Sequence, residues 1–323
     1  MKCLIPTESN DNHSIMVKRA LEKMGHKATI FFPYSHHDKY DLLLEDDYDV
    51  VWWRRNAFIA NQDDYSSAIK ENAFFYDIVS QHIKPNAWWI NPKDAANRAN
   101  FKLLQLKIAS DSGLTIPTTL CSDDPHEIQS FFFEYGHLEI IRKPLYQNQQ
   151  RELVYPSRTT YLDCSISQSI NQKPSIFQTK VIKKYNLRLI CFGDYIVAIK
   201  LSPRALNVVA PFGVPLDLAV KVRAMMSELG IVFGTFDFIV TPENEFIFLD
   251  LNEQGSFLWI ENYNPALKLL DIFVNFLLNQ STDFMWNPNR IQHSLEGFGQ
   301  RQKHVSKHPS AHHSSLDYTG MEC

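Results

Sequence analysis

Apolar and polar positions follow two different periods along the first third of the chain. Residues 2–6 (KCLIP) and 26–32 (HKATIFF) are short apolar runs, which favour strands, and residues 48–56 (YDVVWWRRN) contain a third. Residues 14–25 (SIMVKRALEKMG) instead carry apolar side chains at helical spacing and stop at a glycine. Strand, helix and strand joined by short links predict a βαβ unit, so we expect residues 1–95 to form a small α/β layer.

The rest of the chain alternates between helical and strand patterns. Residues 91–113 open with a Pro/Asp helix start and continue as one helix to a glycine, and residues 125–136 form another helix. Gly193 and Asp194 separate two apolar runs and predict a two-residue hairpin turn. The remaining expected elements are a strand after Pro117, strands at 138–145, through 174–202, at 234–240 and at 245–252, and helices at 216–230 and 264–279.

The two strands around the turn sequence TPEN place acidic residues on one face. If Glu243 and Asn244 form a two-residue loop, Asp237 lies directly opposite Asp250. A four-residue loop would leave Asp237 on the same face, one diagonal step away. Residues two apart share a strand face, so Asn252 joins them. Two facing carboxylates repel each other unless a cation lies between them, and oxygen ligands suit Mg²⁺, with Mn²⁺ as the alternative. The other interpretation of this pattern is a hydrogen-bonded polar pair at a strand end.

Three basic residues are candidates for holding phosphate groups. Lys143 ends the strand EIIRKP, and Lys102 lies one turn into a helical pattern, in NFKLLQL. A lysine in such a place suits a phosphate as a point charge, although each lysine alone is also typical of a solvated surface. Arg188 lies mid-strand, and its leucine neighbours face the other way. Its fork therefore suits an oxyanion or a transferred phosphoryl group, the alternative being an exposed strand face.

Residues 175–182 (SIFQTKVI) have the form of a hinge between two lobes. A strand edge at this place would offer backbone N–H and C=O groups to an adenine. The sequence contains no GxxxxGK[ST], GxGxxG or GxSxG pattern. This disfavours P-loop, Rossmann and serine-hydrolase chemistry.

Composition and charge narrow the function classes further. The 323 residues carry a net charge of −4, so we expect no nucleic-acid partner. No apolar run approaches the roughly 18 residues of a membrane-spanning helix. The five cysteines are scattered and the N-terminus turns polar, so we expect a cytoplasmic protein with free thiols. We expect residues 284–323 to be a flexible tail, the alternative being a metal-binding tail formed by its histidines (His293, His304, His308, His312 and His313).

The order of these features resembles the ATP-grasp fold and, more narrowly, the graspetide (microviridin-type) peptide ligases. The stretches that carry the resemblance are VVWWRRNAF, WINPKDAANRANFKLLQLKIASDSGLTIPTT, IFQTKVIKKYNLRLICFGDYIVA and GTFDFIVTPENEFIFLDLNEQGSFLWIE. The last is the most specific, because family members carry an acidic residue, then Asn, then Gly and aromatic residues ending in Glu. The resemblance implies a mixed α/β and α+β protein that binds nucleotide between two lobes. Its expected parts are an N-terminal pre-ATP-grasp domain at 1–95, a central lobe at 96–180 and a C-terminal lobe at 181–283.

The resemblance also implies roles for single residues. Asp237, Asp250 and Asn252 are implied as metal ligands at the nucleotide phosphates, although the family usually has Glu at the second position. Arg188 is implied as the catalytic arginine near an acyl phosphate. The other implied contacts are Lys102 and Lys143 for phosphate, Gln178, Thr179, Lys180 and Val181 for adenine, Asn186 at the ribose position, Arg54 and Arg55 for packing or substrate, and Glu261 for the acceptor side or for structure.

The activity that the resemblance implies is an ATP-dependent carboxylate–amine or carboxylate–hydroxyl ligase. Its substrate would be an Asp or Glu side chain of a precursor peptide, activated as an acyl phosphate and joined to Thr, Ser or Lys of the same peptide. ATP and Mg²⁺ are the implied cofactors, the precursor peptide is the implied partner, and a homodimer is compatible with the resemblance. The alternatives are an ATP-grasp ligase that acts on free amino acids or a protein tail, and a nucleotide-binding module without catalysis.

Overall fold

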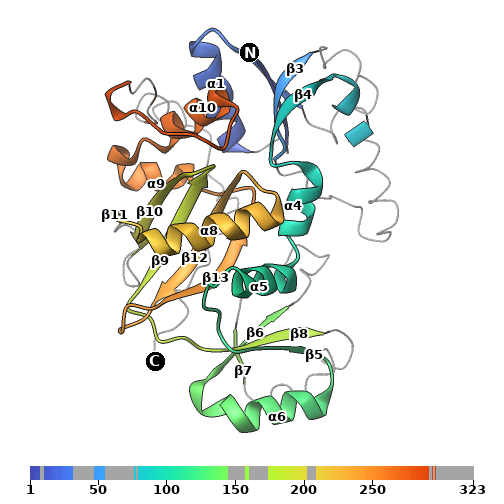
Figure 1. Ribbon diagram of the computed structural model, residues 1–323, viewed down its shortest axis with the longest axis vertical. Helices are drawn as coiled ribbons and strands as arrows, with labels where there is room; N and C mark the ends of the chain where they lie inside the picture. The colour runs from blue at the N-terminus through green and yellow to red at the C-terminus, as the bar shows by residue number, and fades with distance from the viewer. Residues whose placement is uncertain are drawn as a thin grey trace, which may run out of the picture.

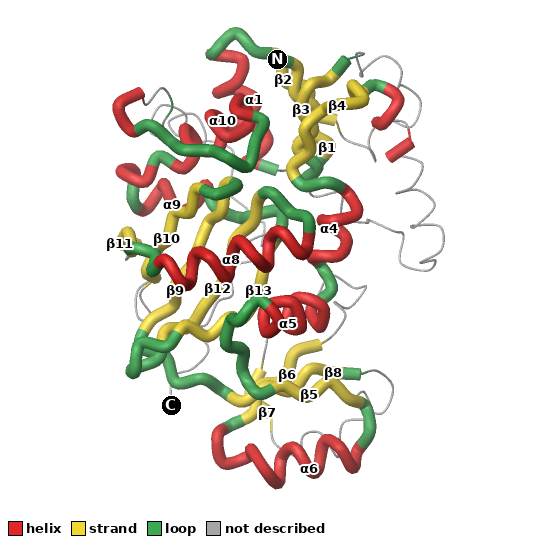
Figure 2. The backbone as a smooth tube through the Cα atoms, in the orientation of Figure 1, coloured by secondary structure: helices red, strands yellow, loops and turns green. Residues whose placement is uncertain are grey.

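The structure, a computed structural model, arranges three sheets along its long axis (Figure 1). A parallel sheet lies at the N-terminal end, a five-stranded antiparallel sheet in the middle and a four-stranded antiparallel sheet at the far end. Figure 2 shows helix α8 running across the middle sheet and helix α6 along the far sheet. The structure describes residues 1–7, 11–31, 47–54, 76–77, 79–144, 157–159, 174–201, 209–290, 293 and 295.

The N-terminal sheet has the strand order β2-β1-β3-β4, and all its pairs are parallel. Its helix α1 begins where the side chain of Asp11 accepts the backbone N–H of Ser14 at 3.1 Å, which satisfies one of the unpaired donors of a helix start. The predicted βαβ unit is confirmed. The elements are β1 (Lys2–Pro6), α1 (Asn12–Lys23), β2 (Lys27–Phe31), β3 (Tyr48–Trp52) and β4 (Ile83–Ile90).

The prediction of one helix over residues 91–113 is wrong, because two helices occupy this stretch. Helix α4 (Lys93–Ala99) ends where the Asn100 side chain donates to the carbonyl of Ala96 at 2.9 Å. Such a side-chain bond competes with the helical backbone pattern. Phe101 is extended, with φ −80° and ψ 104°, and α5 (Lys102–Asp111) starts anew after it. The break directs α5 against strand β13 of the middle sheet.

The far sheet has the strand order β5-β8-β6-β7 and is antiparallel throughout. Helix α6 starts at a proline and is capped by Asp124, which accepts the backbone N–H of His126 at 2.8 Å. Its apolar face buries Ile128 and Phe131 against Phe177 of the sheet. The elements are β5 (Thr119–Ser122), α6 (Pro125–Tyr135), the 3₁₀ helix η1 (Gly136–Leu138), β6 (Ile140–Pro144), β7 (Ser157–Thr159) and β8 (Ser175–Thr179).

The middle sheet has the strand order β11-β10-β9-β12-β13, so β13 is an outer strand. The predicted hairpin turn at Gly193 and Asp194 is confirmed by the pairing of Phe192 with Tyr195. The predicted helix end at Gly230 is also confirmed, with φ 76°. The elements are β9 (Tyr185–Phe192), β10 (Tyr195–Leu201), β11 (Val209–Phe212), α8 (Leu216–Leu229), β12 (Phe233–Val240), β13 (Phe246–Asn252), α9 (Leu258–Tyr263), η3 (Pro265–Leu267), α10 (Leu269–Asn279) and η4 (Pro288–Arg290).

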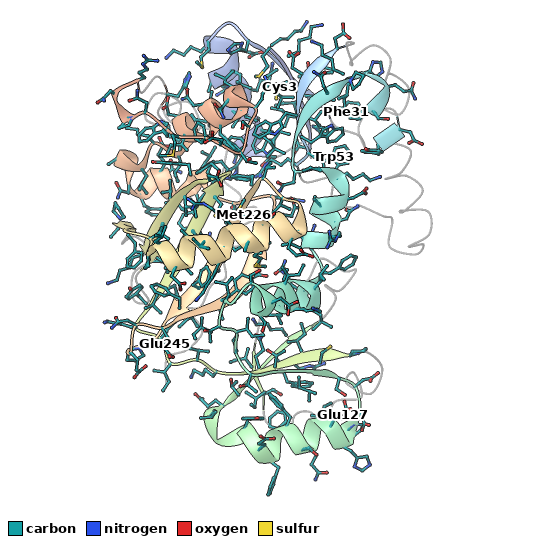
Figure 3. All side chains as sticks on the ribbon, in the orientation of Figure 1. Cys3, Phe31, Trp53, Glu127, Met226 and Glu245 are labelled. Atoms are coloured by element: carbon teal, nitrogen blue, oxygen red, sulfur yellow. The ribbon has the colours of Figure 1, made fainter. Side chains whose placement is uncertain are left out.

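One core joins the N-terminal layer to the C-terminal helix α10, which packs on α1. Trp52 of β3 lies against Phe273 of α10, with ring centroids 4.6 Å apart. Trp88 of β4 meets Phe276 at 4.8 Å. In Figure 3, Cys3 lies inside this N-terminal end of the molecule, whereas Met226 of α8 belongs to a separate core on the other face of the middle sheet. The first and last α-helices of the described residues, α1 and α10, therefore share one apolar core.

Residues just after position 283 do not behave as the flexible tail that we expected. Phe284 is buried in the shared core, and Trp286 donates its indole N–H to Asp271 at 2.7 Å. His293 is buried and its backbone N–H donates to the same carboxylate at 3.0 Å. The other four tail histidines lie outside the described residues. Among the described helices, none is long and apolar enough to cross a membrane.

We expect Gly193→Ala to destabilise the protein by about 3 kcal/mol, combining an overpacked contact with a left-handed backbone. Gly193 has φ 57°, and an added Cβ would lie 2.2 Å from the carbonyl oxygen of Thr282. Gly25→Ala is the matched control, because Gly25 has φ 79° but no atom within 4 Å of the new Cβ. It should lose only about 1 kcal/mol. Urea unfolding of both variants measures the difference, and equal losses would contradict this assignment.

Candidate active site

The hairpin of β12 and β13 places Asp237 directly opposite Asp250, as the sequence predicted. The loop that joins the two strands, however, differs in length from the predicted one. The loop contains three residues, 242–244, and closes with a bond from the Thr241 N–H to the Glu245 carbonyl at 3.0 Å. Asn244 at φ 69° takes the left-handed position typical of such loops. The predicted two-residue loop is therefore wrong.

A β-bulge restores the register that the longer loop displaces. Phe238 pairs with Phe248, yet Asp237 pairs with Asp250, so Leu249 is an extra residue in β13. The bulge lets Phe248 and Leu251 both lie in the core beneath α8. Asp250 consequently lies on the opposite face, on the same side as Asp237. Thr235 pairs with Asn252, which continues this polar face towards the end of the strand.

The two facing carboxylates are each paired with a basic side chain. Arg188 on β9 lies beside Asp237 and donates from Nε and Nη2 to its two oxygens, at 2.7 and 2.8 Å. Lys102, the first residue of α5, forms an ion pair with Asp250. The Asp250 side chain is 31% exposed, whereas the Asp237 side chain is 15% exposed. The repulsion expected between them is thus offset by cations of the chain itself, and Asp250 is the more accessible carboxylate.

Lys143 brings a third cation to the same place from the far sheet. Burial lowers the pKa of Lys143, the nearby Asp250 carboxylate raises it, and Lys102 lowers it. The two lysines, which come from different elements, therefore both interact electrostatically with the Asp250 carboxylate. The sequence predicted Lys102 and Lys143 as phosphate contacts, and in the structure both lysines interact with the same carboxylate, that of Asp250. An anion between them would find two donors and a favourable field.

The side chain of Asn252 shapes the turn after β13. Its Oδ1 accepts the backbone N–H groups of Gln254 at 3.0 Å and Gly255 at 3.2 Å. This Asx turn directs the chain away from the sheet, and Gly255 takes φ 58° there. Among the described residues, no three His, Cys, Asp or Glu side chains gather as metal ligands. The two carboxylates are hard ligands, which fit Mg²⁺ because that ion keeps waters and binds phosphate oxygens. The amide oxygen of Asn252 would join them only by giving up one of its two backbone donors.

Asn91 joins the first residues of β12 to the segment after β13. Its Oδ1 accepts the N–H groups of Val232 and Phe233 at 2.8 and 2.9 Å, and its Nδ2 donates to the carbonyls of Phe233 and Glu253, both at 2.8 Å. The Glu253 side chain accepts from Asn100 at 3.2 Å. Burial raises the pKa of Glu253 to about 7. Neither Asn91 nor Glu253 was predicted from the sequence. An Asn before a Pro indicates only a helix start.

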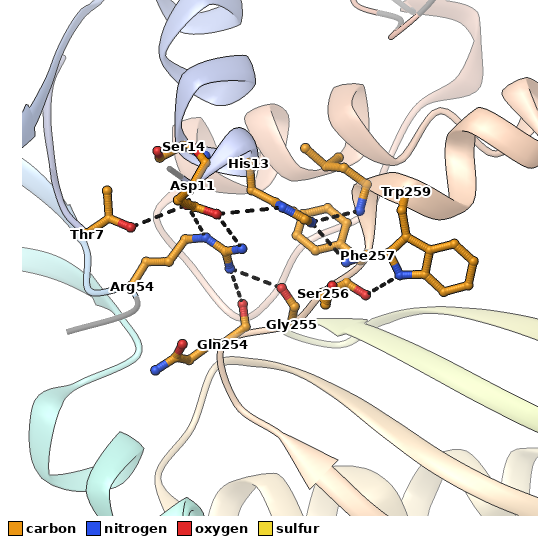
Figure 4. A network of polar contacts seen from close by, with 11 residues as sticks. Thr7, Asp11, His13, Ser14, Arg54, Gln254, Gly255, Ser256, Phe257 and Trp259 are labelled. Atoms are coloured by element: carbon orange, nitrogen blue, oxygen red, sulfur yellow. Dashed lines mark hydrogen bonds and ion pairs between the residues drawn. The ribbon is translucent and has the colours of Figure 1, made fainter. Parts of the chain in front are cut away.

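Arg54 is fully buried in a network that Figure 4 shows from close by. Its Nε and Nη2 donate to the two oxygens of Asp11 at 2.5 and 3.0 Å. Its Nη1 donates to the carbonyls of Gln254 and Gly255 at 2.7 and 3.0 Å. Of the two predicted roles, this geometry favours packing over substrate contact. Arg55 lies outside the described residues.

Next to this network, His13 holds the start of α9. Its Nε2 accepts the backbone N–H groups of Phe257 and Leu258, both at 3.2 Å (Figure 4). The ring therefore bears no proton on Nε2. Asp11 lies 3.8 Å from His13 Nδ1. The turn after the acidic strand is thus held by two side chains of the N-terminal layer, which periodicity could not reveal.

Glu261 is a buried residue that links three segments. One carboxylate oxygen accepts the N–H of Leu270 at 2.8 Å, at the start of α10, and the other accepts the N–H of Leu295 at 3.1 Å. Burial raises the pKa of Glu261, and these backbone donors lower it. Of the acceptor-side and structural roles, this geometry favours the structural one.

The predicted adenine hinge is only partly available for a nucleotide. Strand β8 lies between β5 and β6, so Gln178 and Thr179 are not at a sheet edge as we expected. Gln178 is buried and donates to Thr119 Oγ1 at 2.9 Å. The backbone N–H of Lys180 donates to the Glu139 carbonyl at 2.9 Å, and its Nζ pairs with the Glu139 carboxylate. Val181 follows beyond the strand, and Asn186 lies half-buried at the start of β9.

The chain was compared with protein families, with curated proteins and with solved structures. No family model and no curated protein matches the chain. Among solved structures, the macrocyclase MdnC of Microcystis aeruginosa MRC, bound with the precursor peptide MdnA, matches with a TM-score of 0.72 and 26% identity, over 87% of this chain and 100% of that one. A RiPP-associated ATP-grasp ligase of Chryseobacterium gregarium, in complex with ADP and a leader and core peptide, matches with a TM-score of 0.69 and 20% identity, over 87% and 97%.

The protein has the ATP-grasp fold. Its match to RiPP ATP-grasp ligases extends over most of the chain. The ATP-grasp ligase PsnB, complexed with minimal precursor, Mg and ADP, matches with a TM-score of 0.68 and 17% identity, over 86% of this chain and 97% of that one. The expected fold class is therefore confirmed. The acidic hairpin and Arg188 belong to the middle sheet, whereas Lys102 belongs to α5 and Lys143 to the far sheet.

We expect Glu253→Gln to change how stability depends on pH. The carboxyl has a folded pKa of about 7, above its ordinary value of 4.5, so its ionisation costs folding stability. This loss of stability is absent below about pH 4.5, grows as the pH rises and is complete above about pH 7. Relative to wild type, the variant should gain up to about 3 kcal/mol in free energy of unfolding across this window. Denaturation at a series of pH values measures it, and parallel curves would contradict it.

Proposed function

We propose that the protein is an ATP-dependent ligase that modifies a precursor peptide. It would activate an Asp or Glu side chain of the peptide as an acyl phosphate and join it to a hydroxyl or amine of the same peptide. The observation that carries the proposal is the meeting of Asp237 and Asp250 with Arg188, Lys102 and Lys143 between two lobes of an ATP-grasp fold. The likeness to MdnC and PsnB supports the choice of a peptide substrate.

The ligand set fits a hard divalent cation together with nucleotide phosphates. Asp237, Asp250 and Asn252 would hold Mg²⁺, with Mn²⁺ as the alternative, and the ion would neutralise charge on the phosphate oxygens. Lys102 now pairs with Asp250, and a cation at that carboxylate would leave the Lys102 amine to a phosphate. Lys143 would contact phosphate from the other lobe. The same carboxylate can thus exchange a protein cation for a metal ion when the nucleotide enters.

The reaction would proceed in two steps at this junction. A carboxylate oxygen of the peptide attacks the γ-phosphorus of ATP, the bond to the β,γ-bridging oxygen breaks, and ADP leaves with that bond's electrons. A hydroxyl or amine then attacks the acyl carbon and loses its proton to solvent, and phosphate departs. Arg188 would stabilise the oxyanion of this second step. Its position beside Asp237 keeps the guanidinium within reach of the phosphate end of the site.

The precursor peptide provides the direct test of the proposed activity. A short open reading frame beside the gene, co-expressed with the enzyme in a bacterial host, should yield a peptide that has lost one water for each bond formed. Intact-mass spectrometry measures the loss, and fragmentation locates the bridged side chains. Omission of the enzyme is the control. ATP hydrolysis with no loss of water from any neighbouring peptide would contradict the peptide-ligase proposal.

We expect Asp250→Asn to weaken binding of Mg-ATP. A ligand at a hundredfold excess over its Kd stabilises a protein by about 2.7 kcal/mol, so the loss appears as a smaller thermal shift. Asp217→Asn is the matched control, because Asp217 also pairs with a lysine, Lys221, but lies exposed on α8. The control should keep the full shift. An unchanged shift in Asp250→Asn would show that this carboxylate is not at the nucleotide.

A further inference from the structure

Strand β13 is an outer strand of the middle sheet, so the backbone groups on its free side need partners. At Leu251 these partners come from one side chain, Gln105 of α5. Its Oε1 accepts the Leu251 N–H at 3.1 Å, and its Nε2 donates to the Leu251 carbonyl at 2.9 Å. The amide of Gln105 therefore pairs with Leu251 as the peptide group of a further strand would.

Leu251 lies between the two candidate metal ligands of this strand, Asp250 and Asn252. Its own side chain is buried in the core beneath α8, on the opposite face. A pair of bonds at its N–H and carbonyl fixes the height and tilt of the backbone at that residue, and thereby the directions of its two neighbours. The same helix begins with Lys102, which pairs with Asp250. Helix α5 thus contacts a side chain of the acidic strand through Lys102 and the backbone of that strand through Gln105.

The orientation of the Gln105 amide is itself fixed. Nε2 also donates to the carbonyl of Ala99, the last residue of α4, so both of its hydrogens point at carbonyl oxygens. A rotated amide would place its oxygen against those two carbonyls and its donors against the Leu251 N–H. Gln105 is only 1% exposed, so water does not compete at this place. One orientation satisfies every group.

We propose that Gln105 is a positioning residue for the metal site, holding Leu251 so that the neighbouring Asp250 presents its carboxylate to the cation and Asn252 keeps its place at the end of the strand. The proposal rests on the function proposed above. A purely protective role, covering the strand edge, would leave cation affinity unchanged when the bonds are lost. A positioning role ties cation affinity to the two bonds at Leu251.

The test compares Gln105→Met, which has a similar shape but no amide, with wild type. Free Mn²⁺ is measured by electron paramagnetic resonance during titration of protein with ADP present, well below the unfolding temperature. The affinity for Mn²⁺ should fall about tenfold, in the range known for residues that support metal ligands. Binding of ADP without metal, followed by calorimetry, should change less than twofold. Hydrogen exchange of the peptide covering residues 246–252 should become faster, which reports on Leu251 directly.

Two further variants keep the test decisive. Val17→Ala removes buried apolar contact from α1, in a different core from α5, and should leave Mn²⁺ affinity unchanged. An equal loss in this control would overturn the proposal in favour of general destabilisation. Gln105→Asn, which keeps the amide but shortens its reach, should also lower the affinity and serves if Gln105→Met does not fold. Faster exchange at 246–252 with wild-type Mn²⁺ affinity would overturn the positioning role alone, whereas no Mn²⁺–ADP binding by wild type would refute the proposed function.

Discussion

The structure depends on how it accommodates two carboxylates that face each other on neighbouring strands. Two like charges about 4 Å apart at an effective dielectric constant of about 20 repel by about 4 kcal/mol. Asp237 and Asp250 are offset by Arg188 from the next strand and by Lys102 from α5, with Lys143 arriving from the far sheet. Each cation comes from a different element. The acidic hairpin therefore draws its compensating charges from the middle sheet, from α5 and from the far sheet.

The sequence predicted the pairing of Asp237 with Asp250 correctly through two errors that cancel. The period of two and the turn sequence TPEN were enough to identify the hairpin and its polar face. The loop is one residue longer than expected, which alone would have shifted the register. The extra residue Leu249 in the bulge shifts it back. A bulge depends on tertiary packing, here that of Phe248 and Leu251 in the core beneath α8. The local pattern of a strand therefore cannot reveal it.

The roles of buried charged residues were the least predictable part of the site. Arg54 was read as a packing or substrate residue, and only the fold decides between these. Its partners are Asp11, which is 43 residues earlier, and carbonyls 200 and 201 residues later. Glu261 likewise finds backbone donors 9 and 34 residues away. By contrast, the helix and strand types of most segments follow from local periodicity, which is why the layer order and hairpin turn could be predicted.

Two buried neutral amides hold the backbone around this site, alongside the charged Arg54. The charged side chains of Lys102 and Lys143 both interact with Asp250, at the phosphate site that we propose. The amides Asn91 and Gln105 instead bond to the backbone at the ends of β12 and β13. An amide donates and accepts at once and adds no net charge. A lysine or glutamate in either place would bury a further charge beside the two aspartates and their basic partners. Neutral groups avoid this cost in free energy. Neutral amides therefore fix the backbone without changing the net charge of the site, which is set by the charged side chains.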